Sequence, residues 1–215
     1  MGREFVNIFD GWVDSYDRSV AGKDPEYQDV FEGYETILNE VARRVSGTII
    51  EFGTGTGNLT EKLVEAGNSV IGIEPNSKML KVTAERFPSI KIVDGDLLEF
   101  NVQNETIDAF ASTYVFHHLT DEEKGMALKK YASLLSTNGK VVFADTVFLT
   151  EGVKQAQISK ERNRGYLNVV KDLEREYYTT IPVLKQLFTE AGFQVEFLKM
   201  NDYVWLMEAT KNKER

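Results

Sequence analysis

The chain has 215 residues, a length that fits one domain with a full hydrophobic core. Its formal net charge of −9 argues against nucleic acid as a partner, because duplex binding is usually driven by a basic face. The absence of cysteine excludes disulfides, thiolate metal sites and cysteine nucleophiles. Because no stretch resembles a membrane span or a signal peptide, we expect a cytoplasmic protein that binds neither nucleic acid nor membrane.

Strand-like and helix-like segments alternate along most of the chain. Residues 1–46 are expected to form a helical N-terminal cap. Short apolar runs then predict strands at 48–52, 69–74, 90–93, 107–112 and 140–146. The segments between them predict helices at 58–66, 76–87 and 121–136, the last opened by a Thr120–Glu123 capping box. This alternation is typical of a parallel sheet with crossover helices.

The last third of the chain has a different pattern. The charged stretch 153–178 is predicted as one helix, within a helical insertion at 153–180 on the substrate side. A helix at 181–191 precedes two strand-like runs, 193–199 and 203–210, whose short link permits only an antiparallel hairpin. The predicted fold is therefore α/β: a Rossmann-like parallel sheet with helices on both faces and a C-terminal antiparallel hairpin, forming a single domain over 1–215.

A glycine-rich turn, with Gly53, Gly55 and Gly57, follows the first predicted strand. Without a Cβ in the way, such a turn lets backbone approach a ligand, and it aims the N–H groups of the following helix at that ligand. We therefore expect a nucleoside-like cofactor, either S-adenosylmethionine or a nicotinamide dinucleotide. The dinucleotide fingerprint requires glycine where this chain has Asn58, so the spacing favours S-adenosylmethionine.

Acidic residues follow the next two predicted strands. Glu74 lies about 20 residues after the glycines, where a carboxylate accepts hydrogen bonds from ribose hydroxyls. Asp96 is placed to accept a hydrogen bond from the adenine amine, and the Leu97 backbone N–H can serve a ring nitrogen. The alternative is that Asp96 or Asp94 makes an Asx turn.

These motifs together resemble the class I S-adenosylmethionine-dependent methyltransferases, over nearly the whole chain. The residues that carry the resemblance are Glu51-Phe52-Gly53-Thr54-Gly55-Thr56-Gly57, Gly72-Ile73-Glu74, Asp94-Gly95-Asp96-Leu97 and Ile107-Asp108-Ala109-Phe110. Further resemblance to the YrrT group of bacterial methyltransferases lies in Met1-Gly2-Arg3-Glu4-Phe5, in the block 116–124 and in Val141-Val142-Phe143-Ala144-Asp145-Thr146. The resemblance implies a seven-stranded fold, methyl transfer, and closure of Tyr16 over the methionine part of the cofactor. A core aromatic role for Tyr16 is the alternative.

Candidates for chemistry on the acceptor are few, because methyl transfer depends mainly on positioning. The two histidines, His117 and His118, follow the fourth predicted strand, and Asp145 ends the fifth. Each is a candidate for removing a proton from an acceptor, and a packing role for the histidines is the alternative. The sequence shows no evident set of metal ligands, so we expect no metal.

The sequence therefore predicts methyl transfer from S-adenosylmethionine to a small molecule. One alternative is a protein that binds S-adenosylmethionine or S-adenosylhomocysteine without turnover. The other is an NAD(P)-dependent oxidoreductase.

Overall fold

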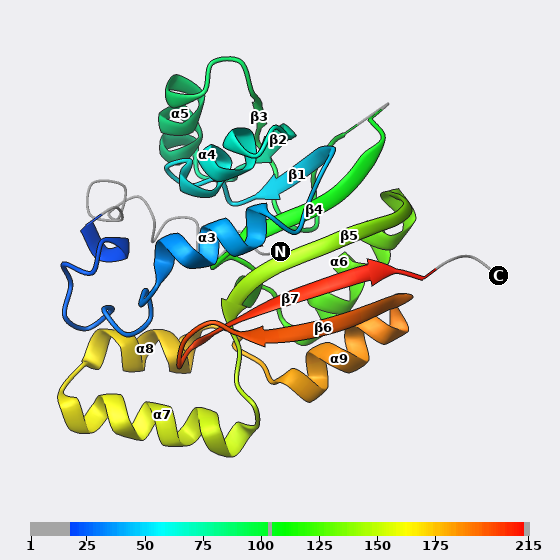
Figure 1. Cartoon of the computed structure of the whole chain (residues 1–215). Coiled ribbons are helices and arrows are strands. Elements are labelled where there is room, and N and C mark those ends of the chain that lie inside the picture. The colour runs from blue at the N-terminus through cyan, green and yellow to red at the C-terminus, as the bar shows by residue number, and fades with distance from the viewer. Residues whose placement is uncertain (1–17, 103–104, 213–215) are drawn as a thin grey trace.

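A single mixed sheet organises the computed structural model, which describes residues 18–102 and 105–212 (Figure 1). The strand order is β3-β2-β1-β4-β5-β7-β6. The strands are β1 (Thr48–Phe52), β2 (Ser69–Ile73), β3 (Lys91–Val93), β4 (Ile107–Thr113), β5 (Leu135–Thr146), β6 (Phe193–Lys199) and β7 (Val204–Lys211). Strands β1 to β5 are parallel, and β7 pairs antiparallel with both β5 and β6, so the predicted fold is confirmed.

Helices cover both faces of this sheet. They are α3 (Tyr34–Ala42), α4 (Asn58–Glu65), α5 (Ser77–Arg86), α6 (Asp121–Leu134), α7 (Glu151–Arg164), α8 (Leu167–Arg175) and α9 (Ile181–Glu190). Apolar side chains of α3 and α4 pack on one face, and those of α6 and α9 pack on the other. The predicted capping box is present: Thr120 accepts from the Glu123 N–H, and the Glu123 side chain accepts in return. None of the described helices has the length and apolarity needed to cross a bilayer.

The end of β1 is fixed by an aromatic cluster. The Phe52 ring stacks on Phe110 of β4 at 5.5 Å and on Tyr131 of α6 at 5.2 Å between centroids. All three side chains are fully buried, and burying each aromatic side chain stabilises the fold by about 1.5–3 kcal/mol. The glycine turn that follows Phe52 therefore starts from a rigid point. It lies where the strand order reverses between β1 and β4, which is where ligands bind in open α/β sheets.

The single helix predicted for 153–178 is wrong. Gly165 adopts a left-handed conformation (φ 78°) and ends α7, so the chain turns before α8 begins. The second helix ends at Arg175, and Glu176 is extended (φ −90°, ψ 161°). A glycine often ends a helix, but the prediction passed over Gly165 because charged residues continue on both sides of it.

The predicted helical cap is also only partly correct. Within the described part of 1–46, the helical pieces are 18–20 and α3, and the segment between them consists of turns. Left-handed Gly22 (φ 71°) and Gly33 (φ 70°) flank this turn segment, and Pro25 within it lacks the N–H that a helix interior needs. Strand β5 also differs from its prediction at 140–146. It begins at Leu135, because Leu135 pairs with Ile107 of β4 before a register shift.

Two left-handed glycines beside α4 provide a matched stability test. A Cβ on Gly57 (φ 89°) would lie 2.6 Å from Phe87 Cε2, whereas a Cβ on Gly67 (φ 83°) meets nothing within 4 Å. We expect Gly67→Ala to lower the free energy of unfolding by about 1–2 kcal/mol through backbone strain alone. Gly57→Ala should lose about 1–3 kcal/mol more through overpacking. Urea denaturation of both variants measures these changes. Equal decreases in the free energy of unfolding would contradict the close packing of Gly57 against Phe87.

Candidate functional site

The three glycines of the turn have different surroundings. All are left-handed, with φ of 65° at Gly53, 54° at Gly55 and 89° at Gly57. A Cβ on Gly53 would collide with Val115, and one on Gly57 would collide with Phe87. A Cβ on Gly55 would meet only Gly53 O, at 4.0 Å, among the described residues other than its chain neighbours. Gly53 and Gly57 thus allow close packing, and Gly55 leaves the space beside its Cα open to a ligand.

Glu74 joins this turn to the end of β2. Its Oε2 accepts a hydrogen bond from Gly55 N, and its Oε1 accepts one from Asn76 N, both at 2.9 Å. Burial raises the pKa of Glu74 to about 7, against the opposing effect of the two N–H donors. Each carboxylate oxygen has a second lone pair, so Glu74 can still accept from hydroxyl groups of a ligand. The structure therefore brings two predicted cofactor residues, Gly55 and Glu74, into direct contact.

Asp96 lies at the tip of β3 and forms a turn. Its Oδ1 accepts from the N–H groups of Leu98 and Glu99, both at 2.8 Å, which is the Asx-turn alternative from the sequence. The neighbouring Leu97 is buried, and its carbonyl accepts from the Tyr131 hydroxyl at 2.6 Å. These bonds fix the loop beyond β3. The adenine contacts predicted for Asp96 and Leu97 remain a prediction, and Tyr16 lies outside the described residues.

Buried polar oxygens close to the glycine turn test whether this region fits a cofactor. Glu51 Oε1, Thr54 Oγ1 and Ser112 Oγ find no hydrogen-bond partner among the described residues. A buried polar atom left in this way costs about 1–3 kcal/mol, so its retention calls for a reason. Thr54 follows β1, and Ser112 of β4 is level with Phe52. The hydroxyls can donate and the Glu51 oxygen can accept, so the ends of β1 and β4 fit a polar ligand that carries both an acceptor and a donor.

The second carboxylate oxygen of Glu51 accepts a hydrogen bond from a side chain of α4. Its Oε2 accepts from Thr60 Oγ1 at 2.6 Å. Burial, together with the nearby charge of Glu74, raises the pKa of Glu51 to about 8, in spite of the Thr60 bond. Glu51 was quoted in the sequence motif but not predicted as a site residue.

Tyr114 has a strained backbone just after β4. Its φ of 58° is unusual for a residue with a large side chain, and such conformations gather at functional sites. Its N–H donates to Ala144 O at 2.9 Å, and its ring lies 5.1 Å from Phe31 and 5.9 Å from Tyr34. The turn carries the chain from β4 into the 3-10 helix Phe116–His118. No sequence signal identified this residue.

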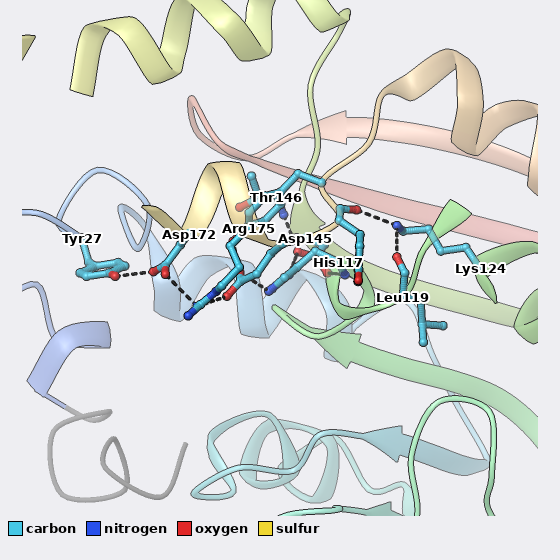
Figure 2. A network of polar contacts seen from close by, with 11 residues as sticks. Tyr27, His117, Leu119, Lys124, Asp145, Thr146, Asp172 and Arg175 are labelled. Carbon is cyan, nitrogen blue, oxygen red and sulfur yellow. Dashed lines mark hydrogen bonds and ion pairs between the residues drawn. The ribbon is translucent and has the colours of Figure 1, made fainter. Parts of the chain in front are cut away.

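His117 is held between two carboxylates (Figure 2). Its Nδ1 lies 2.7 Å from Asp145 Oδ1, and its Nε2 lies 3.3 Å from Glu176 Oε2. Its backbone N–H also donates to Asp145 Oδ2 at 3.0 Å. Burial alone would lower the pKa of His117, but the two carboxylates raise it to about 10. In turn, His117 lowers the pKa of Asp145 although burial opposes this.

Glu176 is the functional candidate that the sequence missed. Its Oε2 accepts from the Tyr178 hydroxyl at 2.7 Å, and its Oε1 accepts from Arg175 Nη2 at 2.8 Å. The Tyr178 ring stacks on His117, with centroids 4.7 Å apart. The wrong helix prediction for 153–178 would have placed Glu176 on a solvated helical face. The observed break at Arg175 instead turns it towards the ends of β4 and β5.

The network extends to the N-terminal segment (Figure 2). Arg175 Nη2 also donates to Asp172 Oδ1 at 2.9 Å, and the Tyr27 hydroxyl donates to Asp172 Oδ2 at 2.5 Å. Figure 1 shows α7, α8 and this blue N-terminal segment at the edge to which the arrows of β4 and β5 point. We call Tyr27, His117, Asp145, Asp172, Arg175, Glu176 and Tyr178 the His117 network.

His118 differs in charge from its neighbour. Its ring lies 4.2 Å from that of His117. Burial and the adjacent positive His117 lower the pKa of His118 to about 3. At neutral pH, therefore, His117 is charged and holds protons on both ring nitrogens, whereas His118 is neutral and weakly basic.

Relatives of known sequence identify the family. A family model described as a methyltransferase domain matches residues 49–139. A protein of Anoxybacillus flavithermus, named uncharacterized methyltransferase, is 52% identical over 211 residues, which cover 98% of this chain and 100% of the relative. A protein of the same name from Bacillus cereus is 47% identical over 212 residues, covering 98% and 100%.

Solved structures share the fold at much lower identity. Magnesium protoporphyrin IX methyltransferase from Synechocystis has a TM-score of 0.67 and 16% identity, covering 96% of this chain and 99% of that one. An S-adenosylmethionine-dependent methyltransferase from Mesorhizobium loti has a TM-score of 0.62 and 17% identity, covering 81% and 95%. The chain belongs to this family of methyltransferases.

Proposed function

We propose that this enzyme is a cytoplasmic methyltransferase of the YrrT group that methylates a small molecule. The observation that carries the proposal is the contact between Gly55 and Glu74 at the tips of β1 and β2, beside buried oxygens that find no partner in the described part of the chain. Nucleoside cofactors need this combination of open backbone and ribose-accepting carboxylate. The family membership favours methyl transfer over the nicotinamide alternative.

The cofactor residues follow from these contacts. Glu74 accepts the ribose hydroxyls, Asp96 and Leu97 serve the adenine, and the Gly53–Gly57 backbone lies along the nucleoside. Glu51, Thr54 and Ser112 meet the methionyl end through the oxygens to which residues 18–102 and 105–212 provide no hydrogen-bond partner. When bound, S-adenosylmethionine supplies a methyl group already activated on sulfonium, so the protein must mainly align the acceptor and exclude water.

The acceptor lies beside the His117 network, at the end of the sheet where α7 and α8 are found. In this proposal the chain is one domain, and α7–α8 form its substrate-side insertion. His117 acts as a positioning residue, because a doubly hydrogen-bonded imidazolium has no lone pair with which to take a proton. His118 is neutral but weakly basic, so alignment rather than proton removal carries most of the rate.

Turnover against a metabolite extract tests the reaction. The protein is incubated with S-adenosylmethionine and fractions of a bacterial small-molecule extract, and S-adenosylhomocysteine is measured. We expect at least one fraction to support its formation above the rate without acceptor. Binding of S-adenosylmethionine with no turnover in any fraction would favour the non-catalytic alternative, and tight NADH binding alone would favour the oxidoreductase.

Cofactor affinity should depend on pH through Glu74. Ribose hydroxyls bind best to the ionised carboxylate, and the pKa of about 7 leaves Glu74 largely protonated at lower pH. We expect S-adenosylhomocysteine affinity to rise roughly tenfold or less from pH 6 to pH 8, the limit set by ionisation of one group. Calorimetry at several pH values measures this. The slope should be smaller in Glu74→Gln, and an equal slope in that variant would assign the effect elsewhere.

A further inference from the structure

We propose that His117, His118 and Glu176 form a binding site for one Zn²⁺ ion. Each offers a ligand atom, and these atoms all lie within 4.8 Å of one another. The sequence did not predict this set, because Glu176 is far from the histidines along the chain. Metal binding here is independent of the proposed substrate, whereas the position of the metal beside an acceptor rests on the proposed function.

The spacing of the ligand atoms suits zinc. His117 Nε2 and Glu176 Oε2 are 3.3 Å apart. Ligands bonded at about 2.0–2.1 Å in a tetrahedron stand roughly 3.3 Å from each other, so these two atoms already have the spacing of zinc ligands, and the His118 nitrogen must move in from within 4.8 Å to complete the set. Two imidazoles and one carboxylate form a set that favours zinc over magnesium, which prefers oxygen ligands. Three protein ligands leave a fourth position open for another molecule.

The residues around the ligands are those that orient a metal site. Asp145 Oδ1 holds His117 Nδ1 at 2.7 Å, which directs Nε2 towards Glu176. A carboxylate on the second nitrogen of a ligating histidine is the usual supporting contact in zinc proteins. Glu176 is oriented in turn by the Tyr178 hydroxyl on Oε2 and by Arg175 on Oε1.

Access and charge are compatible with an ion. The side chains of His117 and Glu176 retain 9% and 10% exposure, so the cluster is sheltered but not sealed. In the metal-free protein each ring nitrogen of His117 carries a proton, one facing Asp145 and one facing Glu176, and the ion would replace the proton on Nε2. The positive charge of Arg175 works against cation binding, but Arg175 contacts Oε1 of Glu176, whereas Oε2 accepts from the Tyr178 hydroxyl and keeps a second lone pair for the metal. The competing account is a purely structural ion pair, which the experiment must distinguish.

Metal binding by the purified full chain tests the site. Protein stripped with a chelator is titrated with Zn²⁺ by calorimetry, and bound zinc is measured by elemental analysis after dialysis. We expect one ion per chain, with loss of that ion in His118→Gln and Glu176→Gln. Asp145→Asn should weaken binding about 10–100-fold, the usual effect of removing a supporting contact. Glu174→Gln, an exposed acid of α8, is the matched control and should bind as the parent does.

Cobalt gives a readout that does not depend on the variants folding. Co²⁺ added to the unmodified chain should produce the visible absorption of a tetrahedral site with nitrogen and oxygen ligands. Absence of that spectrum together with no retained zinc would overturn the proposal, as would zinc binding unchanged in folded His118→Gln and Glu176→Gln. Since no cofactor or acceptor is present, failure here leaves the methyl-transfer proposal standing. Conversely, a protein that retains zinc but shows no turnover would contradict the methyl-transfer proposal and leave the zinc proposal standing.

Discussion

Replacing Glu74 by alanine should weaken S-adenosylmethionine binding by about 1.5–3 kcal/mol, roughly 10-fold to 150-fold in the dissociation constant. The carboxylate is the hydrogen-bond acceptor for the ribose in our proposal, and bonds to a charged group are the strong ones. The effect has a second source. Glu74 also accepts hydrogen bonds from Gly55 N and Asn76 N. Its replacement removes both bonds, so the glycine turn that lines the proposed cofactor site is less firmly positioned.

Calorimetry measures the affinity, and a thermal melt confirms that the variant is folded. Glu85→Ala is the matched control, because this α5 glutamate has a side chain 69% exposed. It should bind the cofactor as the unmodified chain does. Equal affinity of Glu74→Ala and Glu85→Ala would remove Glu74 from the cofactor site.

Replacing His117 by asparagine should lower the free energy of unfolding by about 3–5 kcal/mol. The histidine is the positive partner of two carboxylates, with Asp145 fully buried and Glu176 nearly so. Removing one partner of a buried ion pair leaves the other charges without compensation, which is the costly case. Lys199→Ala breaks an exposed pair with Asp202 and should change stability by less than about 1 kcal/mol.

The loss caused by His117→Asn should depend on pH. The pKa of His117 is about 10 in the folded chain and 6.5 for the unperturbed residue, so folding favours the protonated form. This contribution is complete below pH 6.5 and is lost as pH rises through 10. Urea denaturation of both proteins from pH 6.5 to 10 tests this. The difference between them should shrink with rising pH, and a constant difference would show that His117 is not the charged partner.

Features that depend on local chain chemistry were predictable. Strand and helix alternation gave the sheet and its C-terminal hairpin, because a three-residue link such as Met200–Asp202 leaves only the antiparallel arrangement. The glycine turn and Glu74 were predicted from their spacing along the chain. The structure places Gly55 and Glu74 in direct hydrogen-bond contact, and their role in cofactor binding stays a prediction.

Features that depend on distant contacts were not predictable. Glu176 gains its role only when Gly165 interrupts the helix and α8 returns to the sheet, so its charge looked like that of any surface acid. Similarly, His117 and His118 are adjacent in sequence but their pKa values shift in opposite directions, because the bonds of His117 to two carboxylates outweigh its burial, whereas burial and the charge of His117 dominate at His118. The left-handed Tyr114 packs its ring on Phe31 and Tyr34, contacts that no local pattern reveals.

A crystal structure of the protein with S-adenosylhomocysteine tests the central claim most directly. We predict the adenosine across the carboxyl ends of β1, β2 and β3, with the ribose hydroxyls within hydrogen-bond distance of Glu74 and the nucleoside against Gly55. Nucleoside density at any other place, or a Glu74 carboxylate with no contact to the ribose, would contradict the account.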